Sequence, residues 1–191
     1  MIHLHKIIPI GAGLGGGSAD AAYTIINLNE QFSLGLTTAQ MITYARQLGS
    51  DCAFFIENKP TFAIEKGDVF QDIKLDLSEY YILLVNPAIH ISTQEAYAGI
   101  KPQMPSHDLK NTLETSLPLS WNEIVLNDFE KHLFKSYPLL KDIKQQLYEA
   151  GACYASMTGS GATVYAIFDK KPPQLTFDKK YTVKSLKLDD F

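Results

Sequence analysis

Residues 9–22 read Pro-Ile-Gly-Ala-Gly-Leu-Gly-Gly-Gly-Ser-Ala-Asp-Ala-Ala, with five glycines inside seven residues and helix-forming alanines directly after them. Glycine weakens any helix or strand that contains it, so this density indicates a backbone that must turn sharply or approach another group closely. The order of apolar segment, glycine loop and helix favours an anion site. The first N–H groups of a helix lack internal partners, and the helix dipole attracts negative charge there.

Two common nucleotide-binding motifs do not fit this segment. Its spacing Gly11-x-Gly13-x-x-Gly16 matches the dinucleotide fingerprint, which also needs an acidic residue at a strand end about 20 residues further on. The nearest candidate, Glu30, falls late in the expected helix. A P-loop needs Gly-Lys-Ser/Thr after its last glycine, whereas residues 17–19 read Gly-Ser-Ala. A tight glycine turn that packs a helix on a sheet stays open as the structural alternative.

The composition narrows the class of protein. The chain has 191 residues, 46% of them hydrophobic and 20% charged, which is enough for one domain or two small ones with a sizeable core. A net charge of −4 argues against nucleic acid or a membrane surface as the partner. No apolar run is long enough to span a bilayer, and we expect no secretory segment. Cys52 and Cys153 lie far apart and form no metal-ligand spacing, so a reducing cytoplasm is expected.

The first 76 residues are expected to form an incomplete domain around the glycine segment. Its predicted elements are a helix from Ser18, as N-cap, to Phe32; a helix from a capping box of Thr37 and Gln40 to Gly49; a short apolar helix or strand after Asp51; a strand over 61–65; and a turn over 66–68. Two apolar stripes are expected to face the core: Ala21, Ile25, Leu28 and Phe32 on the first helix, and Met41, Ala45 and Leu48 on the second.

The segment before the glycines, from Ile2 to Ile8, predicts part of a strand. Because a domain seldom begins with a strand that has no partner upstream, we expect either a missing N-terminal portion or a short edge strand. His3 and His5 share one face, where the alternatives are a metal pair and two solvated side chains. A chain without its first strands is expected to expose a sheet edge and apolar surface, which favours a homodimer.

Residues 77–191 are expected to form a second, α+β domain. Its predicted elements are a buried strand over 80–87, a short helix over 92–99 capped by Ser92 or Thr93, a loop over 101–118, helices over 121–134 and 139–151, a hairpin of 152–158 with 162–168, and an edge strand over 181–188. The stripe of Leu140, Ile143 and Leu147 gives the second long helix its buried face.

The glycine segment resembles the second motif of the GHMP kinases, small-molecule kinases in which it has the form Pro-x-x-x-Gly-Leu-Gly-Ser-Ser-Ala. Gly16 and Gly17 stand where that form has two serines. Three later segments resemble the family in the same order: LGSD at 48–51, NPAIHISTQEAY at 86–97 and MTGSGATVYAIF at 157–168. The similarity extends over essentially the whole chain. In the family, a segment with the catalytic lysine precedes the glycine motif, and Lys6 matches a different lysine just ahead of the loop.

The resemblance implies an α+β, GHMP kinase-like fold. Residues 1–76 would be an incomplete N-terminal, ATP-binding domain, and residues 77–191 a ferredoxin-like C-terminal domain. It implies transfer of a phosphoryl group from ATP, with Mg²⁺, to a small-molecule hydroxyl. The Gly-Gly-Ser variant is typical of family members that act on a cytidine diphosphate-linked methylerythritol. A homoserine or mevalonate type of kinase and a catalytically inert nucleotide-binding fragment are the alternatives.

The resemblance also assigns roles to residues. Asp51 is the expected catalytic base. The nucleotide is assigned to Lys6, Pro9, Gly11, Gly13, Leu14, Gly15, Gly16, Gly17, Ser18 and Ala19, the substrate to Thr93, Gly159, Ser160 and Gly161, and no metal ligand is assigned. Each assignment has a structural alternative: an N-cap for Asp51 and Ser18, a solvated lysine for Lys6, a helix cap for Thr93, and a plain hairpin turn for the two late glycines.

Overall fold

The computed structural model describes residues 3–104 and 106–189, which divide into two compact units. One unit comprises Met1–Leu14 together with Asp76–Phe191, and the other comprises Gly15–Leu75. The chain passes from one unit to the other between Leu14 and Gly15, in the middle of the glycine segment. Among the described residues, no helix combines the length and the apolar character that crossing a membrane requires.

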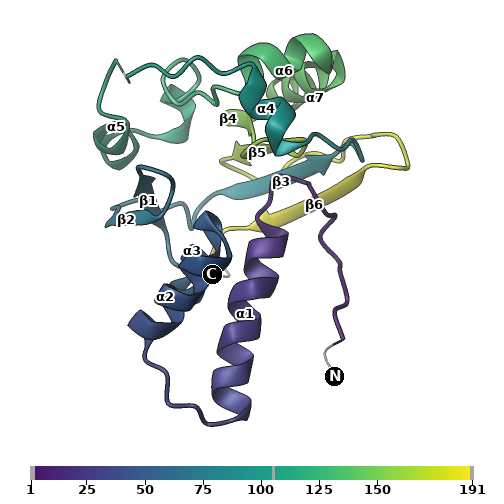
Figure 1. The fold of residues 1–191 in the computed structure, drawn as a ribbon. Coiled ribbons are helices and arrows are strands. Elements are labelled where there is room, and N and C mark those ends of the chain that lie inside the picture. The colour runs from purple at the N-terminus through teal and green to yellow at the C-terminus, as the bar shows by residue number, and fades with distance from the viewer. Residues whose placement is uncertain (1–2, 105, 190–191) are drawn as a thin grey trace. The chain divides into compact units, whose positions relative to one another are not determined.

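The unit of residues 15–75 is a pair of helices with short elements packed beside it. Figure 1 shows α1 and α2 side by side. Its small core consists of Ala45, Cys52 and Ala53, with Ala21 and Ile25 of α1 packed against them. The elements are α1 (Gly16–Gln31), α2 (Thr38–Leu48), η1 (Ser50–Cys52), α3 (Phe54–Glu57), and the antiparallel strands β1 (Thr61–Ile64) and β2 (Val69–Asp72). The predicted strand over 61–65 and the turn after it are confirmed.

Helix α1 begins earlier than its sequence predicts, so the expected Ser18 cap is wrong. Gly15 is the N-cap, with φ +65°, and no side chain caps the helix. Because glycine adopts this left-handed conformation at little cost, the chain enters the helix without a serine. The apolar stripe is also wrong at its far end, since Leu28 and Phe32 are exposed.

Helix α2 confirms the predicted capping box. The Thr37 N–H donates to Gln40 Oε1 over 2.9 Å, and the Gln40 N–H donates to Thr37 Oγ1 over 3.3 Å. The helix ends at Gly49, as expected, and Ala45 is fully buried. Leu48, however, is 64% exposed, because the chain turns at Gly49 and the core beside α2 is completed by Cys52 instead.

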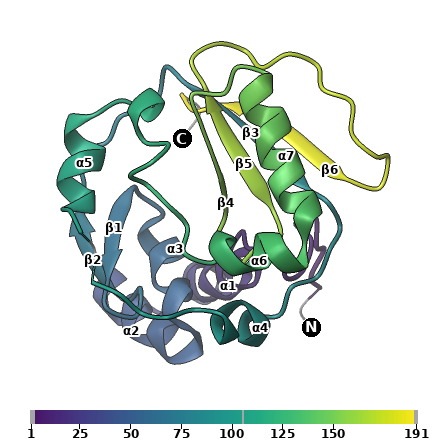
Figure 2. The ribbon, with the colours of Figure 1, turned by 90° about the horizontal axis from the view of Figure 1, so that it is seen from above.

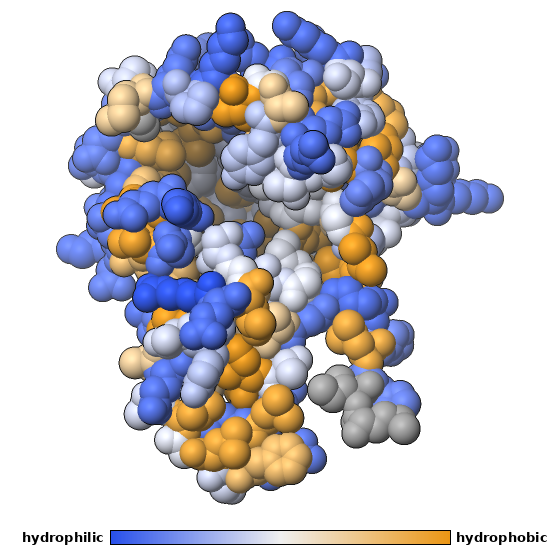
Figure 3. Space-filling view, in the orientation of Figure 1, coloured by the Kyte–Doolittle hydropathy of each residue, from blue (hydrophilic) through white to orange (hydrophobic). Residues whose placement is uncertain are grey.

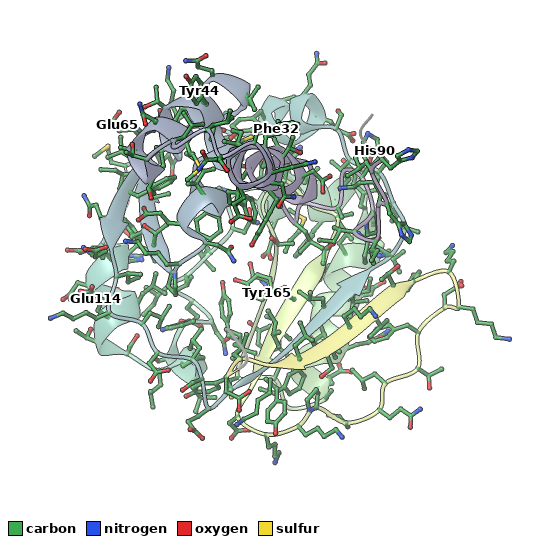
Figure 4. The ribbon with its side chains drawn as sticks, turned by 90° about the horizontal axis from the view of Figure 1, so that it is seen from below. Phe32, Tyr44, Glu65, His90, Glu114 and Tyr165 are labelled. Atoms are coloured by element: carbon green, nitrogen blue, oxygen red, sulfur yellow. The ribbon has the colours of Figure 1, made fainter. Side chains whose placement is uncertain are left out.

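Apolar side chains gather at the free end of this helix pair. Figure 3 shows an orange patch over the end of α1 and the connection to α2. The exposed large side chains of the two helices and their connection include Leu28, Phe32, Leu34, Tyr44 and Leu48, and Figure 4 labels Phe32 and Tyr44 among them. The homodimer expected from the sequence stays a prediction.

The other unit is built on an antiparallel sheet of four strands in the order β4-β5-β3-β6. The strands are β3 (Tyr81–Asn86), β4 (Tyr154–Met157), β5 (Val164–Phe168) and β6 (Thr182–Lys187). The expected hairpin is confirmed by the pairing of Met157 with Val164, and β6 is an edge strand as expected. This order is that of a ferredoxin-like sheet, although residues 169–181, between β5 and β6, contain no helix.

Helices cover one face of this sheet (Figure 2). The predicted stripe of Leu140, Ile143 and Leu147 is fully buried against sheet residues such as Val164 and Phe168. The helices of this unit are α4 (Thr93–Ala98), α5 (Leu109–Thr115), η2 (Pro118–Ser120), α6 (Glu130–Ser136) and α7 (Pro138–Glu149).

Three sequence expectations are wrong in this unit. The loop expected over 101–118 contains α5, whose first turn is capped by the Asp108 carboxylate. The helix expected from 121 begins only at Glu130, directly after a turn in which the Asn127 side chain accepts the N–H of Phe129. Residues 3–9 form no strand, since no strand pairs with them among the described residues.

The opposite face of the sheet carries two tyrosines, the buried Tyr154 and the half-buried Tyr165. Figure 4 shows this face, with Tyr165 on β5. The rings of Tyr154 and Tyr165 meet edge to face at 6.0 Å, and the Tyr154 hydroxyl donates to Val125 O over 2.7 Å. Burial raises the pKa of Tyr165 far above its ordinary value, and it raises the pKa of Tyr154 in the same direction.

These raised tyrosine pKa values predict a loss of stability in alkali. The folded state favours the neutral phenol, so the stabilisation is complete below about pH 10 and declines by about 1.4 kcal/mol per group and pH unit above it. We expect Tyr165→Phe to reduce the fall in unfolding free energy between pH 9 and pH 11, measured by urea titration. Tyr44→Phe, at a half-exposed site, is the control. An equal fall in both variants would contradict the prediction.

Candidate functional site

The first half of the glycine segment, Gly11–Leu14, packs against the loop that joins β4 to β5. The Thr158 hydroxyl donates to Gly13 O over 2.9 Å, and the Thr163 N–H donates to Ala12 O over 3.2 Å. A Cβ on Gly13 would lie only 2.6 Å from Gly161 O and would also clash with Thr158 O. Two glycine loops that are far apart in sequence are therefore in direct backbone contact.

The loop from Thr158 to Thr163 is a tight turn closed by its own backbone. The Thr158 N–H donates to Thr163 O over 2.9 Å, and the Gly161 N–H donates to Thr158 O over 3.0 Å. Gly161 is buried, and a Cβ there would lie 2.8 Å from Met157 Sδ, whereas Gly159 is exposed. The hairpin turn expected here is present, and Gly159 is an exposed residue within it.

The second half of the segment, Gly15–Ala19, forms the start of α1. The first helical bond runs from the Ala19 N–H to Gly15 O over 2.9 Å, so the N–H groups of residues 16–18 have no partner within the helix. No side chain caps them. A Cβ on Gly17 would meet nothing within 4 Å. Free N–H groups, open space and the helix dipole together suit a phosphate group.

Asp51 lies on η1, beside α1 in the same unit. Its expected role as N-cap is wrong, because Gly49 precedes η1 and Asp51 lies within it. The carboxylate is exposed and accepts a hydrogen bond of 3.2 Å from the Ser50 hydroxyl. The residues after it pack on α1: Cys52 and Ala53 belong to one core with Ala21. The ring of Phe55 leaves no room for a side chain on Gly15. The Asp51 segment therefore packs along the N-terminal half of α1.

The other residues that the sequence assigned to the nucleotide or the substrate lie in separate elements. Lys6 and Pro9 lie in an irregular segment of the first unit. Thr93 is the exposed first residue of α4, and Ser92 caps that helix by accepting the Glu95 N–H over 3.1 Å, so the cap expected of Thr93 is wrong. Ser160 is half-buried in the β4–β5 turn. The described residues hold no group of three or more side chains suited to a metal ion.

Sequence reasoning missed three polar residues that contact the glycine loops. The His90 ring, labelled in Figure 4, lies so close to Gly11 that a Cβ there would be 2.6 Å from Nδ1. Asn127 donates to Met157 O and Gly159 O, over 2.7 and 2.9 Å. Glu130 accepts the Met157 N–H over 2.7 Å. The sequence Asn-Asp-Phe-Glu at 127–130, an acceptor shortly before a glutamate, was the available sign of a helix start.

Comparison with known families gives two matches that lie in chain order. Residues 1–59 match the GHMP kinases N terminal domain, and residues 107–178 match the GHMP kinases C terminal region. The chain belongs to the GHMP kinases. In this GHMP kinase chain, the N-terminal match holds the glycine segment and Asp51, and the C-terminal match holds the β4–β5 turn.

Curated relatives of this GHMP kinase chain are named 4-diphosphocytidyl-2-C-methyl-D-erythritol kinase. The protein of Bacteroides thetaiotaomicron is 49% identical over 168 residues, 88% of this chain and 61% of the relative. That of Cytophaga hutchinsonii is 49% identical and covers 90% of this chain and 63% of the relative. The chain thus spans somewhat less than two thirds of the length of these relatives.

Solved structures agree on the fold. A crystal structure of 4-(cytidine 5'-diphospho)-2C-methyl-D-erythritol kinase has a TM-score of 0.68 at 25% identity, over 85% of this chain and 59% of that one. The homoserine kinase from Cytophaga hutchinsonii has a TM-score of 0.53 at 15% identity, over 85% of this chain and 58% of that one, a likeness of fold alone.

Proposed function

We propose that the protein to which this chain belongs transfers the γ-phosphoryl group of ATP to the 2-hydroxyl of 4-diphosphocytidyl-2-C-methyl-D-erythritol. The observation that carries the proposal is the 49% identity to curated kinases of that name, which extends over nearly the whole chain. The contact between the two glycine loops supports it, because a phosphate site needs backbone groups held in a fixed arrangement.

In this proposal the glycine segment holds the triphosphate. The N–H groups at the start of α1 bind phosphate oxygens, and Gly15, Gly16 and Gly17 keep side chains out of their way. Lys6 and the Ser18 hydroxyl add contacts to the nucleotide phosphates. The exposed Gly159 and the half-buried Ser160 contact the substrate, and Thr93 contributes from the start of α4.

Asp51 is the proposed base. Its exposed carboxylate accepts the proton of the substrate hydroxyl while that oxygen bonds to the γ-phosphorus and the bond from phosphorus to the ADP oxygen breaks. Catalysis in phosphoryl transfer depends mainly on positioning and on charge stabilisation, so the helix start and the base act together. The packing of the Asp51 segment along α1 suits that role.

Mg²⁺ belongs to the proposal as the partner of ATP. Proteins commonly hold it with one or two side chains and the phosphates of the nucleotide, so a cluster of carboxylates is not needed. The Ser18 hydroxyl, in the first turn of α1 beside the open space at Gly17, fits such a ligand. When bound, Mg²⁺ neutralises charge on the phosphates.

A substrate panel tests the proposal. The chain is incubated with ATP and Mg²⁺ and with the cytidine diphosphate-linked methylerythritol, homoserine or mevalonate, and product is followed by ³¹P NMR. We expect a new phosphomonoester signal with the first substrate alone. Turnover of homoserine or mevalonate instead would replace the proposal by another GHMP kinase activity. A chain that binds ATP and turns over none of the three would favour an inert nucleotide-binding fragment.

A further inference from the structure

The side-chain amide of Asn127, three residues before the first residue of α6, is hydrogen-bonded to the β4–β5 turn region. Asn127 Nδ2 donates to two carbonyl oxygens of the turn region, Met157 O at 2.7 Å and Gly159 O at 2.9 Å. The other amide atom, Oδ1, accepts the N–H of Phe129, the residue before α6, over 3.0 Å. One side chain therefore fixes the position of Gly159, which has no side chain of its own to anchor it.

A buried carboxylate holds the same region from one turn further along. Glu130 is only 8% exposed, and its Oε1 accepts the Met157 N–H over 2.7 Å and the Ser156 hydroxyl over 3.1 Å. Lys144 Nζ lies 2.6 Å from Oε2 and balances the charge. Burial of an ion pair is costly, and apolar residues of similar volume often stabilise a protein as well or better. Fold stability alone therefore does not explain this arrangement.

Further hydrogen bonds connect the β4–β5 turn to residues 12–13 of the glycine segment. Between the two carbonyls that Asn127 binds stands Thr158, whose hydroxyl donates to Gly13 O over 2.9 Å. A few residues later, the Thr163 N–H donates to Ala12 O. The start of α6, the β4–β5 turn and residues 12–13 thus form one continuous set of hydrogen bonds.

We propose that Asn127 and Glu130 are positioning residues that hold the β4–β5 turn and residues 12–13 in the arrangement that the glycine segment needs to bind the nucleotide phosphates. The naming of that ligand rests on the function proposed above. The positioning itself rests on the hydrogen bonds alone. Neither residue touches the ligand. Asn127 acts through the carbonyls on either side of Thr158, and Glu130 acts through the Met157 N–H and the Ser156 hydroxyl.

Asn127→Asp isolates this role. The carboxylate keeps the acceptor for the Phe129 N–H, so the turn before α6 is retained, but it cannot donate to the carbonyls of Met157 and Gly159. Asn122→Asp is the matched control, since it adds the same charge at an exposed site nearby. Thr158→Val is a second variant, which removes only the donation to Gly13 O and is informative if Asn127→Asp does not fold.

The direct readout is hydrogen exchange at the Thr163 amide, whose acceptor lies on the first glycine loop. We expect exchange there to be about tenfold faster in Asn127→Asp and in Thr158→Val, with α7 amides unchanged and with Asn122→Asp like the unaltered chain. The ATP dissociation constant, measured by calorimetry where each variant is fully folded, is expected to rise about tenfold in the same two variants.

Two results separate this inference from the proposed function. Unaltered exchange at Thr163 in both variants would overturn the positioning role, whatever their affinity for ATP. Faster exchange with unaltered ATP affinity would also overturn it, because the hydrogen bonds would then stabilise the two loops without affecting nucleotide binding. Failure of the unaltered chain to bind ATP would count against the proposed function, and the exchange comparison would still decide whether the loops are positioned by Asn127.

Discussion

Asp51→Asn is expected to lower the rate constant of phosphoryl transfer by about 10²–10⁴-fold, the usual contribution of a positioned base. The amide has nearly the same shape as the carboxylate, and its single oxygen can still accept from the Ser50 hydroxyl. It cannot take the proton of the substrate hydroxyl at neutral pH. The dissociation constant of ATP is expected to stay unchanged, because in the proposed function the start of α1, and not Asp51, binds the phosphates. Single-turnover kinetics and calorimetry measure the two quantities separately.

The matched control is Asp72→Asn, at a strongly exposed carboxylate on β2 of the same unit. We expect it to leave the rate unaltered, since the Asp72 carboxylate forms an exposed ion pair with Lys59, and such pairs contribute little. If Asp51→Asn weakened ATP binding and left the transfer rate intact, Asp51 would be a binding residue and not the base. Equal losses in both variants would point to the net charge of the unit.

Features set by short stretches of sequence were predictable. The Thr37–Gln40 box depends on residues three positions apart, and the buried stripe of α7 depends on helical periodicity. Features set by tertiary contacts were not. Phe32 and Leu48 lie at helical spacing with buried residues, yet they are exposed because no other element of their unit covers them. The late start of α6 follows a turn in which the Asn127 side chain accepts a backbone N–H.

In the candidate site, too, the features set by short stretches of sequence were predictable, and those set by tertiary contacts were not. The glycine segment and Asp51 stood out by residue type and by family resemblance. No sequence pattern predicted that Thr158 would donate to Gly13, since 145 positions separate them. Asn127 and Glu130 lie within the helix expected over 121–134, and nothing in that pattern singles them out, because polar residues are usually exposed. Their role depends on a carbonyl and an amide of another element, which side-chain patterns do not record.

Gly13→Ala is expected to lower both the free energy of unfolding and the affinity for ATP. Gly13 has φ +73°, where a side chain costs about 1–2 kcal/mol. The added methyl group would also lie 2.6 Å from Gly161 O, so the two glycine loops must separate. The total loss of stability is expected to be about 2–4 kcal/mol. Urea titration measures it, and calorimetry with ATP measures the accompanying loss of binding.

Gly17→Ala is the informative counterpart, because the same methyl group is added in a different setting. Gly17 lies in the first turn of α1 with no atom within 4 Å of the new Cβ, and alanine is favoured over glycine in a helix by about 1 kcal/mol. Stability should therefore be unchanged or higher. If phosphate occupies the open space beside the free N–H groups, ATP affinity should still fall, since the methyl group takes up that space. A variant that is stable and binds ATP like the unaltered chain would place the phosphates away from the start of α1.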